Sequence, residues 1–241
     1  MTNGIACCVT HFKVLFSIDQ NMYTVKIFSI VKVTHNVRRF RFEKPEGYHF
    51  NPGQATEVSI NKRGWEEERR PFTFTSLNED PFLEFTIKIY SDHNGVTNEL
   101  GKLIVGDELI IRDVWGAIEY KGPGYFIAGG AGVTPFIAIL RQLYKENKLE
   151  DNILFFSNRT SKDIILENEF NKMLGKNAVY TVTNEYDPNY LNEFINEDFL
   201  KKYVKDFSKN FYVCGPDAMV QDISNILLKL GIVPDALVFE K

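Results

Sequence analysis

The fold is decided by the stretch Tyr125-Phe126-Ile127-Ala128-Gly129-Gly130-Ala131-Gly132-Val133-Thr134-Pro135, which a helical pattern continues to Tyr144. Its first four residues form an apolar run that is too short for a helix and typical of a buried parallel strand. The glycines predict a tight turn, and Thr134 followed by Pro135 predicts a helix start with Thr134 as its N-cap. Such a turn suits the phosphates of a ligand, although a turn that only needs small residues has the same pattern. The spacing differs from the G-x-G-x-x-G fingerprint of common dinucleotide sites.

Strands and helices alternate after this stretch. Apolar runs at Ile153–Ser157, Val179–Val182 and Phe211–Val213 predict further strands, separated by helical patterns. This alternation predicts a parallel sheet covered by helices on both faces. Ligands bind such sheets at the carboxyl ends of the strands, where Gly129–Gly132 and Gly215-Pro216 both lie.

The preceding part of the chain has the period of β-strands. The predicted strands are Tyr23–Val33, Phe40–Phe42, Thr56–Ile60, Phe72–Thr75, Phe82–Tyr90 and Glu108–Ile111, with one short helix from Asn94 to about Lys102. We therefore expect an antiparallel Greek-key β-barrel over residues 22–120 and an α/β domain with a parallel sheet over residues 121–241. Residues 1–21 are predicted to be a disordered or loosely attached leader.

Composition excludes several classes of function. The chain has 241 residues and a net charge of −4, which gives no general footprint for nucleic acid or an anionic membrane. No apolar run of 18 residues occurs, so no membrane span is predicted and we expect a cytoplasmic protein. Cys7, Cys8 and Cys214 have no paired spacing and the histidines are scattered, which argues against disulfides, a metal site or an iron–sulfur cluster.

The charge is distributed unevenly along the chain. Residues 22–70 hold ten Lys or Arg against six Asp or Glu, and residues 71–241 hold seventeen against twenty-five. This excess could be scattered over the surface. Gathered on one face of the barrel, it would suit docking of an acidic partner.

Four motifs now stand in order along the chain. They are Arg70-Pro71-Phe72-Thr73, Asn94-Gly95-Val96-Thr97, Gly129-Gly130-Ala131-Gly132-Val133-Thr134-Pro135 and Cys214-Gly215-Pro216-Asp217-Ala218-Met219. On a barrel followed by a parallel sheet, this set resembles the ferredoxin–NADP reductase superfamily, especially its bacterial flavodoxin/ferredoxin reductase-like members. The resemblance runs from about Tyr23 to the C-terminus. It implies a reductase that takes hydride from NAD(P)H onto FAD and passes single electrons to a separate acidic carrier, flavodoxin or ferredoxin.

The resemblance implies an FAD site on the barrel. Arg70 would pair with a flavin phosphate, Phe72 would lie against the isoalloxazine ring, and Thr73 would hydrogen-bond flavin N5, which receives the hydride. Relatives usually have Tyr where Phe72 stands, so the lost hydroxyl should weaken flavin binding by about 1 kcal/mol. From the residues alone, Phe72 and Phe74 could equally be core aromatics of a strand. The other residues implied to contact FAD are Pro71, Ile87, Lys88, Tyr90, Gly95, Val96 and Thr97.

Among these, Gly95-Val96-Thr97 opens the short helix and would hold the second phosphate of the cofactor, which favours FAD over FMN. A simple turn with a Thr cap is the alternative there. Ile87 and Lys88 belong to the strand that runs beside the flavin in relatives. Tyr90 would stack on the adenine, unless it is a surface aromatic of the barrel.

The nicotinamide nucleotide is assigned by the same resemblance to the parallel sheet. The residues implied to contact it are Gly130, Ala131, Gly132, Val133, Thr134, Pro135, Asn158, Arg159, Cys214, Gly215, Pro216, Asp217 and Met219. Cys214 would help to position the nicotinamide near the path of the hydride, although an inert buried thiol is the alternative. Arg159, with no acid beside it, favours NADPH over NADH unless it is only a solvated loop charge. Phe239 is a candidate for the aromatic that covers the flavin in many relatives.

Two other functions fit the same motifs. One is reduction of free flavin, ferric chelates or quinones by the same fold. The other is a nucleotide-binding subunit of an oxygenase or dehydrogenase that has no turnover of its own.

Overall fold

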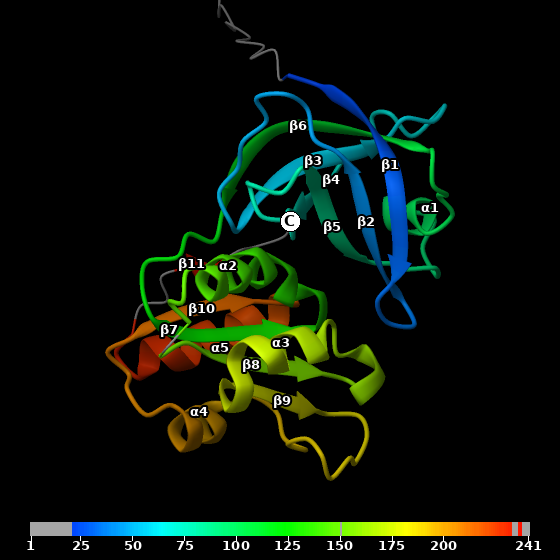
Figure 1. Ribbon diagram of the computed structural model, residues 1–241. Coiled ribbons are helices and arrows are strands. Elements are labelled where there is room, and N and C mark those ends of the chain that lie inside the picture. The colour runs from blue at the N-terminus through cyan, green and yellow to red at the C-terminus, as the bar shows by residue number, and fades with distance from the viewer. Residues whose placement is uncertain (1–20, 150, 233–235, 238–241) are drawn as a thin grey trace, which may run out of the picture.

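The computed structural model describes residues 21–149, 151–232 and 236–237, and it has two domains, shown in Figure 1 with the first domain above the second. The first domain is a six-stranded antiparallel sheet in the order β4-β3-β6-β1-β2-β5. Its strands are β1 (Tyr23–Lys32), β2 (Val37–Glu43), β3 (Gln54–Ile60), β4 (Arg70–Thr73), β5 (Phe82–Lys88) and β6 (Glu108–Ala117). A bridge between Phe74 and Phe85 joins its two edges, so the sheet closes into a barrel. The predicted antiparallel barrel is confirmed.

The core of the barrel is filled by every second side chain of its strands. On β2, Phe40 and Phe42 are fully buried, whereas Arg39 and Arg41 between and beside them point outward. Helix α1 (Val96–Leu100) covers one end of the barrel and contributes the buried side chain of Leu100 to its core.

The second domain has a five-stranded parallel sheet in the order β11-β10-β7-β8-β9, and the predicted parallel sheet is confirmed. Its strands are β7 (Gly124–Gly129), β8 (Ile153–Asn158), β9 (Ala178–Val182), β10 (Asn210–Cys214) and β11 (Ala236–Leu237). Its helices are α2 (Thr134–Lys145), α3 (Glu167–Leu174), α4 (Glu197–Tyr203) and α5 (Asp217–Lys229), with 3₁₀ turns η1 (Gly130–Val133), η2 (Ser161–Asp163) and η3 (Gly175–Asn177).

Both faces of this sheet are covered. Phe136 of α2 and Phe170 of α3 belong to one apolar core, whereas Phe199 of α4 and Ile223 of α5 belong to the core on the other face. Helix α2 lies between the sheet and the barrel (Figure 1). It is therefore the helix through which the two domains meet.

The start of α2 differs from the prediction. The glycine turn forms the 3₁₀ helix η1, which runs directly into α2, so Thr134 is the first residue of α2 and its designation as N-cap is wrong. The Thr134 hydroxyl instead donates to the Ala131 carbonyl oxygen at 3.0 Å. Because the chain is already helical before Thr134, no break exists at which a side chain could cap the helix.

Other differences are smaller. Strand β6 continues past the predicted end at Ile111 and reaches Ala117, and β11 was not predicted. Residues 1–20 of the predicted leader and the candidate Phe239 lie outside the described residues. None of the helices in the described part of the chain is long and apolar enough to cross a membrane.

Candidate functional site

A cavity of about 180 Å³ lies where the barrel meets the start of α2, and we call it the barrel cavity. Strands β4 and β5, helix α1 and the η1–α2 turn all contribute to it. Its lining residues are Arg70, Pro71, Phe72, Thr86, Ile87, Lys88, Tyr90, Thr97, Ala131 and Thr134. Most of the predicted FAD contacts are therefore brought together, from segments far apart in the sequence.

The chemistry of this lining fits a flavin nucleotide. Arg70 is exposed, its Nη1 donates to the Arg69 carbonyl oxygen at 2.6 Å, and no carboxylate within the described residues pairs with it. Such a guanidinium is suited to a phosphate. Thr97 adds a hydroxyl, and Phe72 adds a half-buried aromatic ring. Tyr90 is 44% exposed, with Lys88 Nζ 5.6 Å and the ring centroid of His93 6.3 Å from its own ring centroid, so it adds an aromatic ring at the edge of the cavity.

Three of the predicted FAD residues do not line the barrel cavity. Thr73 is buried opposite Ala55 of β3, because successive residues of a strand point to opposite faces and Phe72 takes the cavity side. The Val96 side chain packs into the barrel core. Gly95 lies in open space, where an added Cβ would meet nothing within 4 Å. Of the motif Gly95-Val96-Thr97, only Thr97 lines the barrel cavity.

A second cavity, of about 400 Å³, lies at the carboxyl ends of β7, β8 and β10, and we call it the sheet cavity. The predicted residues that line it are Gly130, Ala131, Gly132, Asn158, Arg159, Cys214, Gly215, Pro216, Asp217 and Met219. Val133 and Pro135 are buried in the domain, and Thr134 faces the barrel cavity instead. This location is where parallel sheets bind nucleotides.

Asn158 gives the sheet cavity an unsatisfied polar group. The residue is 5% exposed and its Oδ1 has no hydrogen-bond partner among the described residues. A buried acceptor without a partner costs about 1–3 kcal/mol, and a hydroxyl or amide of a bound nucleotide would satisfy it. The observation supports a ligand with hydrogen-bond donors at this point.

The glycines of the two strand-end loops have different roles. A Cβ on Gly132 would lie 2.4 Å from the Cys214 carbonyl oxygen, and one on Gly129 would lie 2.4 Å from Met219 Sδ. Gly132 is thus required because its turn packs against the backbone of the β10–α5 loop. At Gly129 the flexible Met219 side chain could move, but Pro216 Cδ would still lie 2.9 Å from the added Cβ. Gly130 has φ +51° and open space around its Cα, so it alone needs glycine for its backbone conformation. Packing between the loops and backbone conformation therefore each account for a glycine in this turn.

The structure also adds residues that the sequence did not single out. Asp163, from η2, lines the sheet cavity beyond Arg159. Its carboxylate accepts hydrogen bonds from the Thr160 amide at 3.0 Å and hydroxyl at 2.7 Å, and lies 3.7 Å from His35 Nε2 of the barrel. Thr86 could have been found from its alternation with Lys88 on β5. The other additions to the sheet cavity are Asn36, Val37, Ser157, Ile165 and Thr183, and Gly129 of the predicted turn lines it as well.

The two cavities meet at a common wall. Lys88, Tyr90 and Ala131 line both of them. Cys214, which is 2% exposed, closes the sheet cavity at the end of β10. Ligands held in the two cavities would therefore approach each other between β5 and η1.

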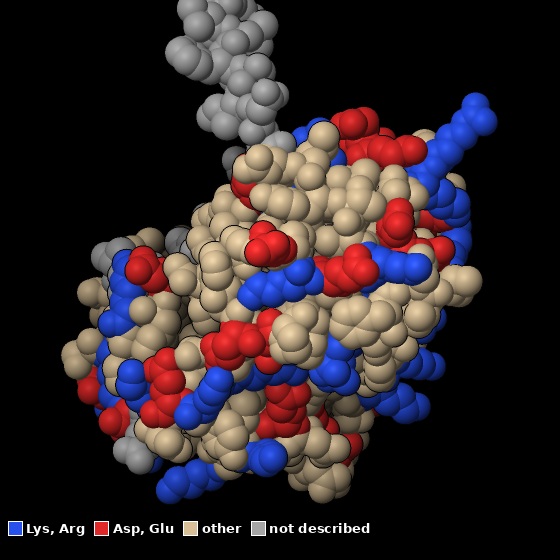
Figure 2. Space-filling model, turned by 45° about the horizontal axis from the view of Figure 1, so that its top comes forward, with Lys and Arg blue, Asp and Glu red and all other residues tan. Residues whose placement is uncertain are grey.

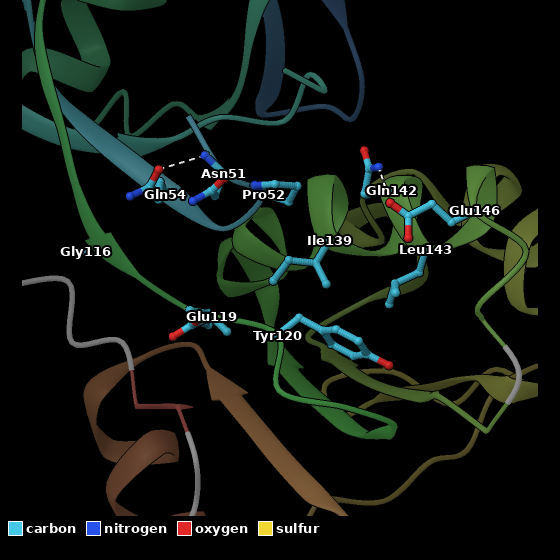
Figure 3. Close-up of a pocket in the computed structure, with 11 residues that line it drawn as sticks. Asn51, Pro52, Gln54, Gly116, Glu119, Tyr120, Ile139, Gln142, Leu143 and Glu146 are labelled. Atoms are coloured by element: carbon cyan, nitrogen blue, oxygen red, sulfur yellow. Dashed lines mark hydrogen bonds between the residues drawn. The ribbon is translucent and has the colours of Figure 1, made fainter. Parts of the chain in front are cut away.

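A third cavity, of about 560 Å³, lies beside the interdomain linker and contains none of the predicted site residues. In Figure 3, Ile139 and Leu143 project from α2 toward Tyr120 of the linker. Polar groups at its rim form hydrogen bonds with one another. The backbone N–H of Asn51 donates to Gln54 Oε1 at 2.7 Å, and Gln142 Nε2 donates to Glu146 Oε1 at 2.5 Å. Its lining residues include Glu119 and Glu146 but no Lys or Arg, so the cavity does not suit a nucleotide phosphate.

Part of the basic excess of the barrel is scattered and paired within the molecule. On the face shown in Figure 2, Lys and Arg are interspersed with Asp and Glu. Among the basic residues of the barrel, Arg39 and Arg41 pair with Glu84, and Lys62 pairs with Glu99. Intramolecular pairing therefore neutralises part of the basic excess of residues 22–70.

Comparison with known proteins agrees with this geometry. Residues 24–120 match the family model of the oxidoreductase FAD-binding domain, and residues 126–225 match that of the oxidoreductase NAD-binding domain. The chain belongs to the ferredoxin–NADP reductase superfamily. The two domain matches make it an oxidoreductase with an FAD-binding and an NAD-binding domain, and they confirm the resemblance found in the four motifs.

Curated relatives in this superfamily include NADH-cytochrome b5 reductase 1 of Rattus norvegicus, which is 26% identical over 83% of this chain and 78% of its own length. NADH-cytochrome b5 reductase 2 of Botryotinia fuckeliana is 29% identical over 86% of this chain and 65% of its own length. A ferredoxin NADP⁺ reductase from Neisseria gonorrhoeae with bound FAD and NADP has a TM-score of 0.76 at 20% identity and covers 87% of this chain and 92% of its own. This structural likeness shows the shared two-domain fold.

Proposed function

We propose that this chain is an NADH-dependent, FAD-containing reductase that delivers single electrons to a separate haem protein of the cytochrome b5 kind. The observation that carries the proposal is the common wall formed by Lys88, Tyr90 and Ala131, where a cavity suited to a flavin meets a cavity suited to a nicotinamide nucleotide. The names of the curated relatives support both NADH and cytochrome b5.

The residues of the chain would bind the flavin and the nicotinamide nucleotide and orient them. Arg70 and Thr97 would hold flavin phosphates, and Phe72 would support the ring. Bound FAD would supply the redox chemistry, accepting a hydride and releasing electrons one at a time. Asn158 would hydrogen-bond the nicotinamide nucleotide, and buried Cys214 would limit where its nicotinamide can lie. Placement within about 3–3.5 Å is the chain's contribution to hydride transfer.

The coenzyme is proposed to be NADH rather than the NADPH favoured by Arg159 alone. Arg159 is exposed, whereas the Asp163 carboxylate lines the same cavity in a fixed position. A carboxylate accepts hydrogen bonds from a ribose hydroxyl and repels a 2′-phosphate. Arg159 would retain some capacity for NADPH.

The acceptor is tested with a panel of carriers. Purified, FAD-loaded protein is assayed anaerobically with NADH or NADPH, and with cytochrome b5, flavodoxin, ferredoxin or ferric citrate as acceptor. We expect the highest kcat/KM with NADH and cytochrome b5. Faster reduction of flavodoxin or ferredoxin would overturn the choice of acceptor. Turnover of ferric citrate alone would make the chain a reductase of small molecules, and absence of any turnover would make it a subunit that depends on a partner.

A further inference from the structure

Helix α2 meets the barrel along one face. Thr134, Arg141 and Lys145 are separated by seven and four residues, so their side chains lie on the same side of the helix. Thr134 lines the barrel cavity, whereas Arg141 and Lys145 form ion pairs with Glu84 and Glu79 of the barrel. Thr134 and Arg141 are about 10 Å apart along the helix axis. One helix face therefore connects the cavity to the ion pairs.

Strand β5 presents the matching face. Glu84, Thr86 and Lys88 alternate along the strand and so point to the same side. Thr86 and Lys88 line the barrel cavity, and Glu84 lies about 7 Å from Thr86 along the strand. Arg141 Nη1 donates to Glu84 Oε1 at 2.7 Å. This bond joins α2 to β5 beside the wall of the cavity.

Arg141 is held from both domains. Its Nη1 also donates to the Thr75 carbonyl oxygen in the barrel, and its Nε and Nη2 donate to the two carboxylate oxygens of Glu169 on α3, at 2.5 and 3.0 Å. Burial lowers the pKa of Arg141, but Glu169 and Glu84 outweigh this effect and raise it overall. The guanidinium is charged and fixed in one orientation.

Glu84 is connected to the cavity by hydroxyl groups. The residue is 1% exposed, and its Oε1 accepts a hydrogen bond from Thr75 Oγ1 at 3.0 Å. Thr75 Oγ1 lies 3.2 Å from Thr86 Oγ1, and Thr86 lines the barrel cavity. Arg41 Nε donates to Glu84 Oε2 at 2.8 Å from the other side. A continuous set of bonds thus runs from α2 to the cavity wall.

We propose that Arg141 and Glu84 are a positioning pair that sets the separation of α2 from β5, and with it the approach of the nicotinamide nucleotide to the flavin. The inference rests on the proposed function. Neither residue touches the reacting atoms, but a displacement of about 1 Å can slow such a transfer by about a hundredfold. A buried ion pair often adds little net stability compared with apolar side chains of similar size, whereas its fixed bonds determine orientation.

The test separates positioning from stability. Arg141→Met and Glu84→Gln each break the pair. The double variant leaves neither of these two charges without the other, although Glu169 loses Arg141 and Arg41 loses Glu84. Lys145→Ala is the matched control, because it removes a solvent-exposed pair from the same helix face. FAD-loaded proteins are mixed anaerobically with NADH in a stopped-flow instrument, and the loss of flavin absorbance is followed.

We expect flavin reduction to slow by about tenfold or more in both single variants, with little change in FAD content or in the Kd of NAD⁺. The double variant should recover part of the unfolding stability that the single variants lose, but its flavin reduction should remain slow. Lys145→Ala should react like the unmodified protein. If Arg141→Met does not fold, Arg141→Lys replaces it, since Lys keeps the charge but cannot make all four bonds of Arg141 in their present directions.

A second readout uses flavin-free protein. Amide hydrogen exchange should rise in Arg141→Met both in Thr86–Lys88 of the barrel and in Ala131–Thr134 of the turn, since the pair restrains both. The inference would be overturned if amide hydrogen exchange rose only in α2, or if the variant reduced its flavin at the rate of the unmodified protein. The inference would also be overturned if the double variant recovered the rate of flavin reduction, because the slower reduction in the single variants would then result from lost stability. Failure of the unmodified protein to react with NADH would refute the proposed function instead, and the exchange measurement would still test the pair.

Discussion

Gly132→Ala should separate the two strand-end loops that form the floor of the sheet cavity. A Cβ at this position would lie 2.4 Å from the Cys214 carbonyl oxygen and 2.5 Å from the Gly215 Cα. Both are backbone atoms, so no side-chain rotation relieves the contact. The β10–α5 loop must move away from the glycine turn, and it carries Cys214 with it.

The size of the effect follows from this overlap. Forcing an extra methyl group into a packed interior costs about 1–3 kcal/mol. For a protein of this length, each kcal/mol lowers the Tm by about 2–4 °C. The affinity for NAD⁺ should also fall, because Gly132, Cys214 and Gly215 line the same cavity. The affinity for FAD should change little, since none of these residues lines the barrel cavity.

The assay compares thermal unfolding and isothermal titration with NAD⁺ in three variants. Gly116→Ala is the control, because an added Cβ there would meet nothing within 4 Å and its φ is not positive. In Gly130→Ala the added Cβ meets no atom within 4 Å, so only backbone strain should lower the stability, by about 1–2 kcal/mol. If Gly132→Ala matched Gly116→Ala in both Tm and NAD⁺ affinity, the interlocked loops would not be what fixes the cavity.

Three further predictions concern single side chains. Arg70→Ala should weaken FAD binding by about 10- to 100-fold, because hydrogen bonds to a charged group contribute about 1.5–3 kcal/mol; fluorescence titration of flavin-free protein measures this, and unchanged affinity would place the phosphate elsewhere. Arg159→Ala should lower kcat/KM for NADPH more than for NADH in parallel assays, and equal losses would remove the case for a 2′-phosphate contact. Burial raises the pKa of Glu84, but Arg141 and Arg41 outweigh this and hold it below its usual value. Its contribution to folding is therefore present above the unfolded pKa of about 4.3 and is lost as pH falls through the lower folded pKa. Glu84→Gln should thus show a smaller decrease in the free energy of urea unfolding on acidification below about pH 5 than the unmodified protein, and parallel decreases would contradict this.

Local periodicity was enough to predict both domains. The alternation of apolar and charged residues on β2 and the strand–helix alternation after Gly124 are patterns that can be read along the sequence, and the structure contains both. The order of the four motifs then brought most of the candidate residues to two adjoining cavities. The conformation of Gly130–Val133 was beyond this reasoning, because a 3₁₀ turn and a capped turn share the same small residues.

Contacts between distant segments were not predictable. Glu84 stands out in the sequence as a charge within the apolar strand Phe82–Ile87, but no spacing rule links it to Arg141, fifty-seven residues later. Asp163 reaches the sheet cavity through a 3₁₀ turn beyond the strand end that the sequence identified. Gly132 was assigned to phosphate contact, and the structure shows that packing against Cys214 also requires it.

The most direct measurement is an anaerobic titration of the FAD-loaded protein with NADH in the absence of any acceptor. If ligands in the barrel cavity and the sheet cavity meet at Lys88, Tyr90 and Ala131, one equivalent of NADH should remove the absorbance of the oxidised flavin. Flavin that stays oxidised while NADH is bound would show that the two cavities hold their ligands apart, and would contradict the account.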